Sequence, residues 1–153
     1  MQTKVATLLS TLILLTGCAG TPPKLGVESG QLTACPATPN CVSSQTSDPQ
    51  HAVAPLSLTG TPTEVHAQLL QVLGTLDRTE VVISKPDYIA AEVTSQIFRF
   101  VDNVEFYFPA TAATSAEMVV QVRSASRLGH SDLGVNRERV ELIRSRLKAV
   151  STQ

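Results

Sequence analysis

The chain has 153 residues, of which 42% are hydrophobic and 16% are charged. This length provides for one compact domain with a short appendage and argues against a second folded domain. The 12 basic and 13 acidic residues nearly cancel, so the chain has no net field to hold a nucleic-acid backbone, and nucleic acid ranks low among partners.

The first eighteen residues, MQTKVATLLSTLILLTGC, have the pattern of an export signal. One lysine precedes an uncharged apolar run that is shorter than the roughly 20 residues of a membrane-spanning helix. The closing LTGC resembles the bacterial lipobox, whose cysteine receives a diacylglyceryl group and becomes the new amino terminus. We predict that residues 1–17 are a lipoprotein signal peptide and that Cys18, carrying fatty acids such as palmitate, anchors the chain to a membrane. An ordinary secretory signal with an incidental cysteine is the alternative.

Residues 18–34 are predicted to be the lipidated cysteine and a flexible tether, because they are rich in Gly, Pro, Thr and Ser and lack periodic apolar positions. Such a tether would span roughly 20 Å. A single domain is expected over residues 35–150. With Cys18 assigned to lipid, Cys35 and Cys41 remain as an even pair in an exported protein, which favours a disulfide closing CPATPNC. A metal site lacks the usual ligand spacing, and a redox-active pair is the other alternative.

The next elements have clear periodic patterns. Residues 51–58 form at best a short edge strand around a proline. Thr61 to Glu64 form a capping box with proline at the first helical position, and apolar residues at helical spacing predict a helix that ends near Gly74 and Asp77. Residues 80–84 are β-branched, and after a Pro-Asp turn the residues from Ile89 to Val93 alternate between apolar and polar.

In IFRFVDNVEFYF, residues 97–108, the alternation slips near its start. Asp102 and Asn103 tolerate turn conformations, so we predict a tight hairpin there, with a continuous bulged strand as the alternative. Val104, Phe106 and Phe108 are expected to face inward. A further strand is predicted over residues 118–122. The last apolar positions recur every three or four residues and predict a closing helix, with a cap at Asn136.

The predicted order is therefore β-α-β-β-β-β-α. Each helix has one apolar stripe and the sheet has one apolar face. We expect an α+β domain with an antiparallel sheet of four to five strands and two helices packed on one face, as in helix-grip or TATA-binding-protein-like arrangements. The other face is left to water or a ligand.

The tripeptide His130-Ser131-Asp132 does not predict a hydrolase, because a catalytic triad converges from separated segments and no GxSxG elbow occurs. A serine- and glycine-rich connector more often satisfies backbone groups through turns and caps.

The more specific functional hypothesis for this stretch is the recognition of an anion. Arg123 and Arg127 end the last strand, while Arg137 and Arg139 open the final helix. The competing interpretation is that these charges, together with Arg99, Glu92 and Glu105, pair with one another.

The motifs CPATPNCVSS, FRFVDNVEF and RSASRLGHSDLGVNRERVELIR resemble the bacterial domain-of-unknown-function family 1499, whose members are often lipoproteins or membrane-associated. The resemblance covers about Cys35 to Leu147 and brings no established activity. Asn103 stands where relatives often have a second aspartate, which weakens any scheme that needs paired carboxylates there. The matching positions are Cys35, Pro36, Pro39, Asn40, Cys41, Asp102, Glu105, Arg123, Ser124, Ser126, Arg127, Gly129, Ser131, Asp132, Gly134, Asn136 and Arg137.

We therefore expect a lipid-anchored cell-envelope protein that faces the periplasm or the exterior, on the outer membrane if the host has two membranes. Its domain would be a binding or scaffold module that recognises an envelope protein or a small anionic ligand through the Arg123 to Arg137 region, without a cofactor or a metal. An enzyme using Asp102, Glu105 and the arginines, or a purely structural component, is the alternative. The candidate ligand-binding residues are Arg99, Asp102, Glu105, Arg123, Ser124, Ser126, Arg127, Asp132, Asn136 and Arg137.

Overall fold

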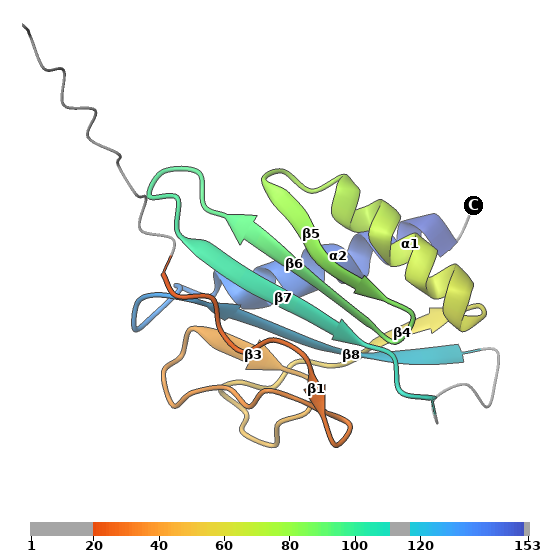
Figure 1. Cartoon of the computed structure of the whole chain (residues 1–153), viewed down its shortest axis with the longest axis horizontal. Helices are drawn as coiled ribbons and strands as arrows, with labels where there is room; N and C mark the ends of the chain where they lie inside the picture. The colour runs from red at the N-terminus through yellow and green to blue at the C-terminus, as the bar shows by residue number, and fades with distance from the viewer. Residues whose placement is uncertain (1–19, 111–116, 152–153) are drawn as a thin grey trace, which may run out of the picture.

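A computed structural model describes residues 20–110 and 117–151. In these residues two helices accompany a six-stranded antiparallel sheet and a separate two-stranded hairpin (Figure 1). The elements are β1 (Val27–Glu28), β2 (Gln31–Leu32), β3 (Cys41–Ser43), β4 (Leu56–Thr59), α1 (Pro62–Gly74), β5 (Thr79–Lys85), β6 (Tyr88–Thr94), β7 (Val101–Tyr107), β8 (Glu117–Ser126) and α2 (Val135–Ser151). The expected α+β class is confirmed, whereas the number and order of strands differ in detail.

The large sheet has the order β3-β8-β7-β6-β5, and β4 also pairs with β8. The strands β3 and β4 share one edge, because β4 pairs with the beginning of β8 and β3 pairs with its end. All of these pairings are antiparallel. Consequently the β5–β6 connection, the end of β7 and the start of β8 lie at one end of the sheet, and the β6–β7 and β8–α2 connections lie at the other (Figure 1).

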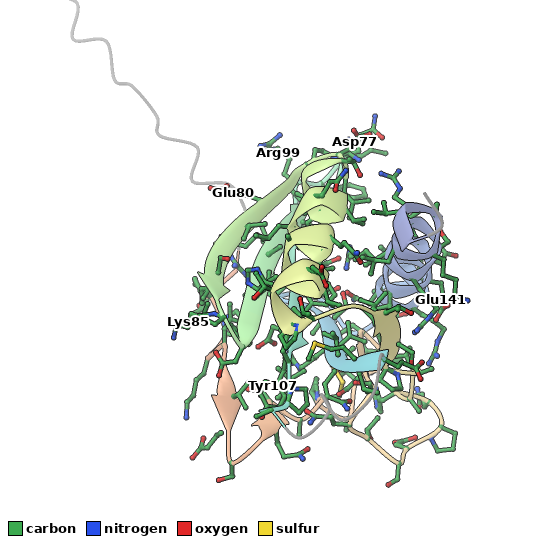
Figure 2. The ribbon with its side chains drawn as sticks, turned by 90° about the vertical axis from the view of Figure 1, so that its right-hand side faces the viewer. Asp77, Glu80, Lys85, Arg99, Tyr107 and Glu141 are labelled. Carbon is green, nitrogen blue, oxygen red and sulfur yellow. A yellow bond between two sulfur atoms is a disulfide. The ribbon has the colours of Figure 1, made fainter. Side chains whose placement is uncertain are left out.

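Both helices pack on one face of the large sheet and form the main hydrophobic core with it (Figure 2). The predicted capping box opens α1: the Thr61 backbone N–H donates to Glu64 Oε2 at 2.8 Å, and the Glu64 backbone N–H donates to Thr61 Oγ1 at 3.3 Å. The apolar stripe of α1, with Leu69 at its centre, and that of α2, with Ile143, are fully buried. The periodicity of the sequence therefore located both helices and their buried faces.

The predicted tight hairpin at Asp102 and Asn103 is wrong, because both residues lie inside the continuous strand β7. The chain turns earlier, between β6 and β7. There the Ser95 backbone N–H donates to the Phe100 carbonyl at 2.8 Å, and the Phe100 N–H donates to Ser95 Oγ at 2.9 Å. Asp102 and Asn103 remain in an extended strand because β6 and β8 hydrogen-bond to β7 from both sides.

The segment expected to be a flexible tether instead includes the β1–β2 hairpin, which covers part of the sheet face opposite the helices (Figure 1). Leu32 is buried there with Tyr88 and Ala90 in a second, smaller apolar cluster. The side chain of Gln45 fixes the hairpin, because it accepts a hydrogen bond from the Leu32 N–H at 2.8 Å and donates to the Gly30 carbonyl at 2.9 Å. The described residues contain no helix that is both long and apolar enough to cross a membrane.

Candidate functional site

The strands β7 and β8 separate the predicted site residues into two groups, because successive side chains of a strand point to opposite faces. Asp102 and Ser124 lie on the helix-covered face, in line with the core residues of the same strands. Glu105 and Arg123 lie opposite each other on the face beneath the hairpin. The predicted residues on these two strands therefore belong to two separate networks and do not converge on one point.

Glu105 is the centre of the first network and has no exposed surface. Its Oε2 accepts a hydrogen bond from Arg123 Nη1 at 2.9 Å, and its Oε1 accepts from the Tyr88 hydroxyl at 2.7 Å and from the Gly26 backbone N–H at 3.1 Å. Burial, reinforced by the neighbouring Glu105 carboxylate, raises the pKa of Tyr88 and keeps its phenol a donor. The network thus ties the β1–β2 hairpin to the sheet through a buried ion pair.

Arg127 continues this network along the same face. Its Nε donates to Asn103 Oδ1 at 2.8 Å, and its Nη2 forms a close ion pair with Glu92. Two buried donors, Asn103 Nδ2 and Arg123 Nε, have no hydrogen-bond partner among the described residues. Since buried polar groups are usually satisfied, these two donors mark places where water would enter the network.

The second network lies on the helix side of the sheet and joins β7, β8 and α2. Arg139 Nη2 donates to Asp102 Oδ2 at 2.6 Å, while its Nη1 donates to Asn136 Oδ1 at 2.6 Å and to Ser124 Oγ at 3.0 Å. Asn136 is fully buried, and its Nδ2 donates to the Asn40 carbonyl and to Ser126 Oγ, both at 3.0 Å. These polar groups hold the start of α2 against the sheet.

The predicted cap at Asn136 is corrected by the structure, because α2 already begins at Val135 and Asn136 points inward. The carboxylate of Asp132 takes the capping position instead, accepting hydrogen bonds from the Asn136 N–H at 2.8 Å and the Gly134 N–H at 3.1 Å. Burial opposes its ionisation, but these backbone donors outweigh burial and lower the pKa of Asp132. The helix terminus that could bind an external anion is thus occupied by the protein's own carboxylate.

The other predicted arginines have different roles. Arg137 donates to the backbone carbonyls of Ala52 at 2.6 Å and Gln50 at 3.0 Å, so it secures the segment that leads into β4. Arg99 is exposed in the β6–β7 connection, near the end of the molecule where Asp77 and Glu80 also lie (Figure 2). It lines a pocket with Glu80 and with Glu92, the ion-pair partner of Arg127, and it takes no part in the contacts of Glu105 or of Arg139.

A Ser-His-Asp triad is also not assembled in this region. Ser124 Oγ donates to Asn136 Oδ1 at 2.6 Å, and His130 is exposed in the connection that precedes α2. A pocket of about 840 Å³ lies beside the β1–β2 hairpin and Lys85, separate from the helix-side network. In the described part of the chain, no group of three or more His, Cys, Asp or Glu side chains is arranged to hold a metal ion.

Sequence reasoning missed Tyr88 and Asn40 as partners in these networks. Tyr88 alternates with apolar residues of the same strand, so the pattern assigns it to the face of the sheet that is exposed to water. Asn40 donates from Nδ2 to the Gly129 carbonyl at 2.8 Å and is buried. Only its place beside the cysteine pair, in CPATPNC, singles it out in the sequence.

The predicted disulfide is present between Cys35 and Cys41, with an S–S distance of 2.02 Å and a Cα–Cα distance of 5.6 Å. Cys41 begins β3 and pairs with Ala125 of β8, so the bridge fastens the chain before β3 to the same end of the sheet as the helix-side network. The predicted lipidation at Cys18 lies outside the described residues.

Comparison with known proteins gives a family but no activity. No protein with a curated description matches the chain significantly. Among solved structures, the fold is similar to the crystal structure of TTHA0849 from Thermus thermophilus, at 12% identity and a TM-score of 0.35, over 72% of this chain and 99% of that one. A similarity of this size says nothing about function. The model of the family described as "Protein of unknown function (DUF1499)" matches residues 31–147, which include both networks and the disulfide, and the chain therefore belongs to this family.

Proposed function

We propose that this protein is a lipid-anchored binding or scaffold module of the cell envelope, which meets its partner through the connection between β8 and α2. One observation carries the proposal: the backbone of this connection is held by polar side chains while its apolar side chains point to solvent. Gly129 is fastened by Asn40 and Gly134 by Asp132. Leu128 is 41% exposed and Leu133 is 91% exposed. A fixed loop with outward apolar side chains suits binding, because little order is lost on contact.

The geometry gives less support to an enzyme that uses Asp102, Glu105 and the arginines. Asp102 and Glu105 lie on opposite faces of β7, and each is already paired with an arginine. An acid and a base must both reach one reacting group, within hydrogen-bond distance or through one water molecule. The paired charges instead favour the interpretation that the arginines hold the fold together.

The lipid anchor is tested by mass spectrometry of the full chain expressed in a bacterium that processes lipoproteins. We expect an amino-terminal peptide that begins at Cys18 and carries a diacylglyceryl group. The Cys18→Ala variant should retain residues 1–17. Recovery of the wild-type chain with its leader intact and its Cys18 sulfur unmodified would contradict the anchor.

The binding surface is tested by a photo-crosslinking amino acid placed at Leu133 in the same cells. Lys85, at the opposite end of the sheet, provides the matched control position (Figure 2). We expect an adduct at Leu133 and none at Lys85. Failure to form an adduct at Leu133 in protein that has folded and reached the envelope would overturn the proposed surface.

A further inference from the structure

The end of the domain that carries the β8–α2 connection also carries the β6–β7 connection, and both present apolar side chains to solvent. Ile97 is 81% exposed, Phe98 70% and Phe100 42%. The rings of Phe98 and Phe100 stack with their centroids 5.6 Å apart. Single exposed apolar residues are common, but a group of them marks an interaction surface. We call this group the apolar tip; it consists of Ile97, Phe98, Phe100, Leu128 and Leu133.

One backbone hydrogen bond and one close approach to a side chain bring the parts of this end together. The Arg127 N–H donates to the Val101 carbonyl at 3.2 Å, which places the start of one connection beside the end of the other. The first described residue, Gly20, lies against the same place, since a Cβ built on it would be 2.9 Å from Leu128 Cγ. Figure 1 shows both connections and the beginning of the described chain at one end of the molecule.

The position of Gly20 limits how far the tip can be from a lipid anchor. Gly20 is two positions after Cys18 in the sequence, and a fully extended chain spans at most about 7 Å over that length. A lipid on Cys18 would therefore hold the apolar tip at the membrane surface, closer than the roughly 20 Å that a free tether of residues 18–34 would allow.

Two residues at this end adopt backbone conformations that are unfavourable for their side chains. Arg99 and Leu133 both adopt positive φ angles, 54° and 56°. This region favours glycine or asparagine, and a leucine there is strained. Leu133 is also nearly fully exposed, so burial of its side chain within this domain does not offset the strain. Both features suit a contact with something outside the domain.

One polar residue of this end, Arg99, is suited to contact lipid headgroups. Residues 95–100 and 127–134 contain two exposed residues that can carry a positive charge, Arg99 and His130, whereas the side chain of Arg127 is buried against Glu92. The acidic residues at this end include Asp132 and, beside Arg99, Asp77 and Glu80 (Figure 2). The Asp132 carboxylate already accepts two backbone hydrogen bonds at the start of α2. Arg99 lies between Phe98 and Phe100 in the sequence and is exposed. Its guanidinium could therefore reach the phosphates of lipid headgroups.

We propose that the apolar tip inserts into the interfacial layer of the lipid bilayer, as a second membrane contact beside the anchor. This inference rests on the proposed lipid anchor and names the bilayer as the partner of the proposed surface. Aromatic and aliphatic side chains at such depths gain from leaving water while the backbone stays at headgroup level. The domain would then stand with the β6–β7 end toward the membrane and the β5–β6 end away from it.

The test uses a fluorescent reporter that the chain itself lacks, since the sequence contains no tryptophan. The full, lipidated chain with Phe98→Trp is reconstituted into vesicles of phosphatidylethanolamine and phosphatidylglycerol that contain lipids with brominated acyl chains. Lys85→Trp, at the far end of the sheet, is the matched control. For side chains buried about 5 to 10 Å into the interface, we expect a blue shift and loss of roughly half the emission of Phe98→Trp. The emission of Lys85→Trp should not change.

Equal quenching of the two variants, or no quenching of either, would overturn the docking. A blue shift of Phe98→Trp without quenching by bromine would assign the tip to contact with a second copy of the chain, and would also overturn the docking. Mass spectrometry of the same sample reads the state of Cys18 separately. A lipidated Cys18 with an unquenched Phe98→Trp therefore rejects the docking and leaves the anchor standing, whereas quenching of a chain with an unmodified Cys18 rejects the anchor alone.

Discussion

Glu105 shows that a charged side chain in the family motif of this chain need not bind a ligand. It lies on a strand face that the alternation assigns to water, yet it has no exposed surface and pairs with Arg123. An ion pair that is removed from water has given up the hydration of both charges, and each member then depends on the other. The two residues are therefore expected to matter for stability.

The Glu105→Gln substitution tests this dependence. Glutamine keeps the shape of the side chain and can still accept hydrogen bonds from Tyr88 and Gly26, but it leaves Arg123 as a buried cation without a counter-charge. We expect the free energy of unfolding to fall by about 3 kcal/mol, measured by urea denaturation. The control is Glu28→Gln, which removes one member of an exposed pair with Lys24 and should have little effect. Similar losses in the two variants would contradict a structural role for Glu105.

Asp132 gives a pH-dependent prediction at the same scale. Its pKa in the folded protein is lowered, so its charge contributes stability above its ordinary pKa of 3.8, and this contribution is lost as the pH falls below that value. The Asp132→Asn variant keeps the capping geometry without the charge. We expect wild type to be more stable than Asp132→Asn at pH 7 and the difference to shrink below pH 3.8, as measured by denaturant unfolding at each pH. A difference that grew in acid would refute the assignment.

At the scale of elements, local signals predicted α1 well because a capping box and an apolar stripe depend only on neighbouring residues. The same signals misplaced the turn at Asp102 and Asn103, since pairing with strands far along the chain decides whether such residues stay extended. They also missed the β1–β2 hairpin. Its two-residue strands have no period to detect, and the polar face that it covers has the same alternation as a face exposed to water.

The two networks were predictable only in part for the same reason. The arginines and carboxylates were identified, as was their capacity to pair, but the choice of partners depends on the register of β7 against β8. Arg123 and Arg127 are four residues apart and lie on one face, whereas Ser124 and Ser126 lie on the other. The turn predicted from the sequence falls inside β7, and with that turn the two faces cannot be told apart. The sequence therefore assigns the arginines to a single site.

The hairpin itself can be tested as an element of the fold. Leu32→Ala removes a side chain that is 5% exposed and packs on Tyr88, so we expect a loss of about 2 to 3 kcal/mol in the free energy of unfolding. Gln31→Ala, at the exposed neighbouring position of the same strand, is the control and should change little. If both variants unfold like the wild type, residues 20–34 behave as the tether that the composition suggested.

At the scale of the whole molecule, β7 is hydrogen-bonded to β6 and β8 along its length, while the hairpin is held by few contacts. We therefore expect hydrogen exchange to show two levels of protection. The amides of β7 should exchange only through global unfolding, and those of Val27 and Leu32 should exchange through an easier local opening. Equal protection of the two regions would show that the hairpin and the sheet unfold together.

The strand β5 forms one edge of the sheet, and its register against β6 shifts between Val81 and Ile83. Such an irregularity twists this edge strand, and the charged residues Glu80 and Lys85 flank it. A strand of another molecule therefore meets no flat row of backbone donors and acceptors with which to pair. Molecules confined to two dimensions meet far more often than molecules in free solution. If the proposed lipid anchor holds many copies on one leaflet, the irregular edge at β5 would keep them from joining edge to edge into fibres.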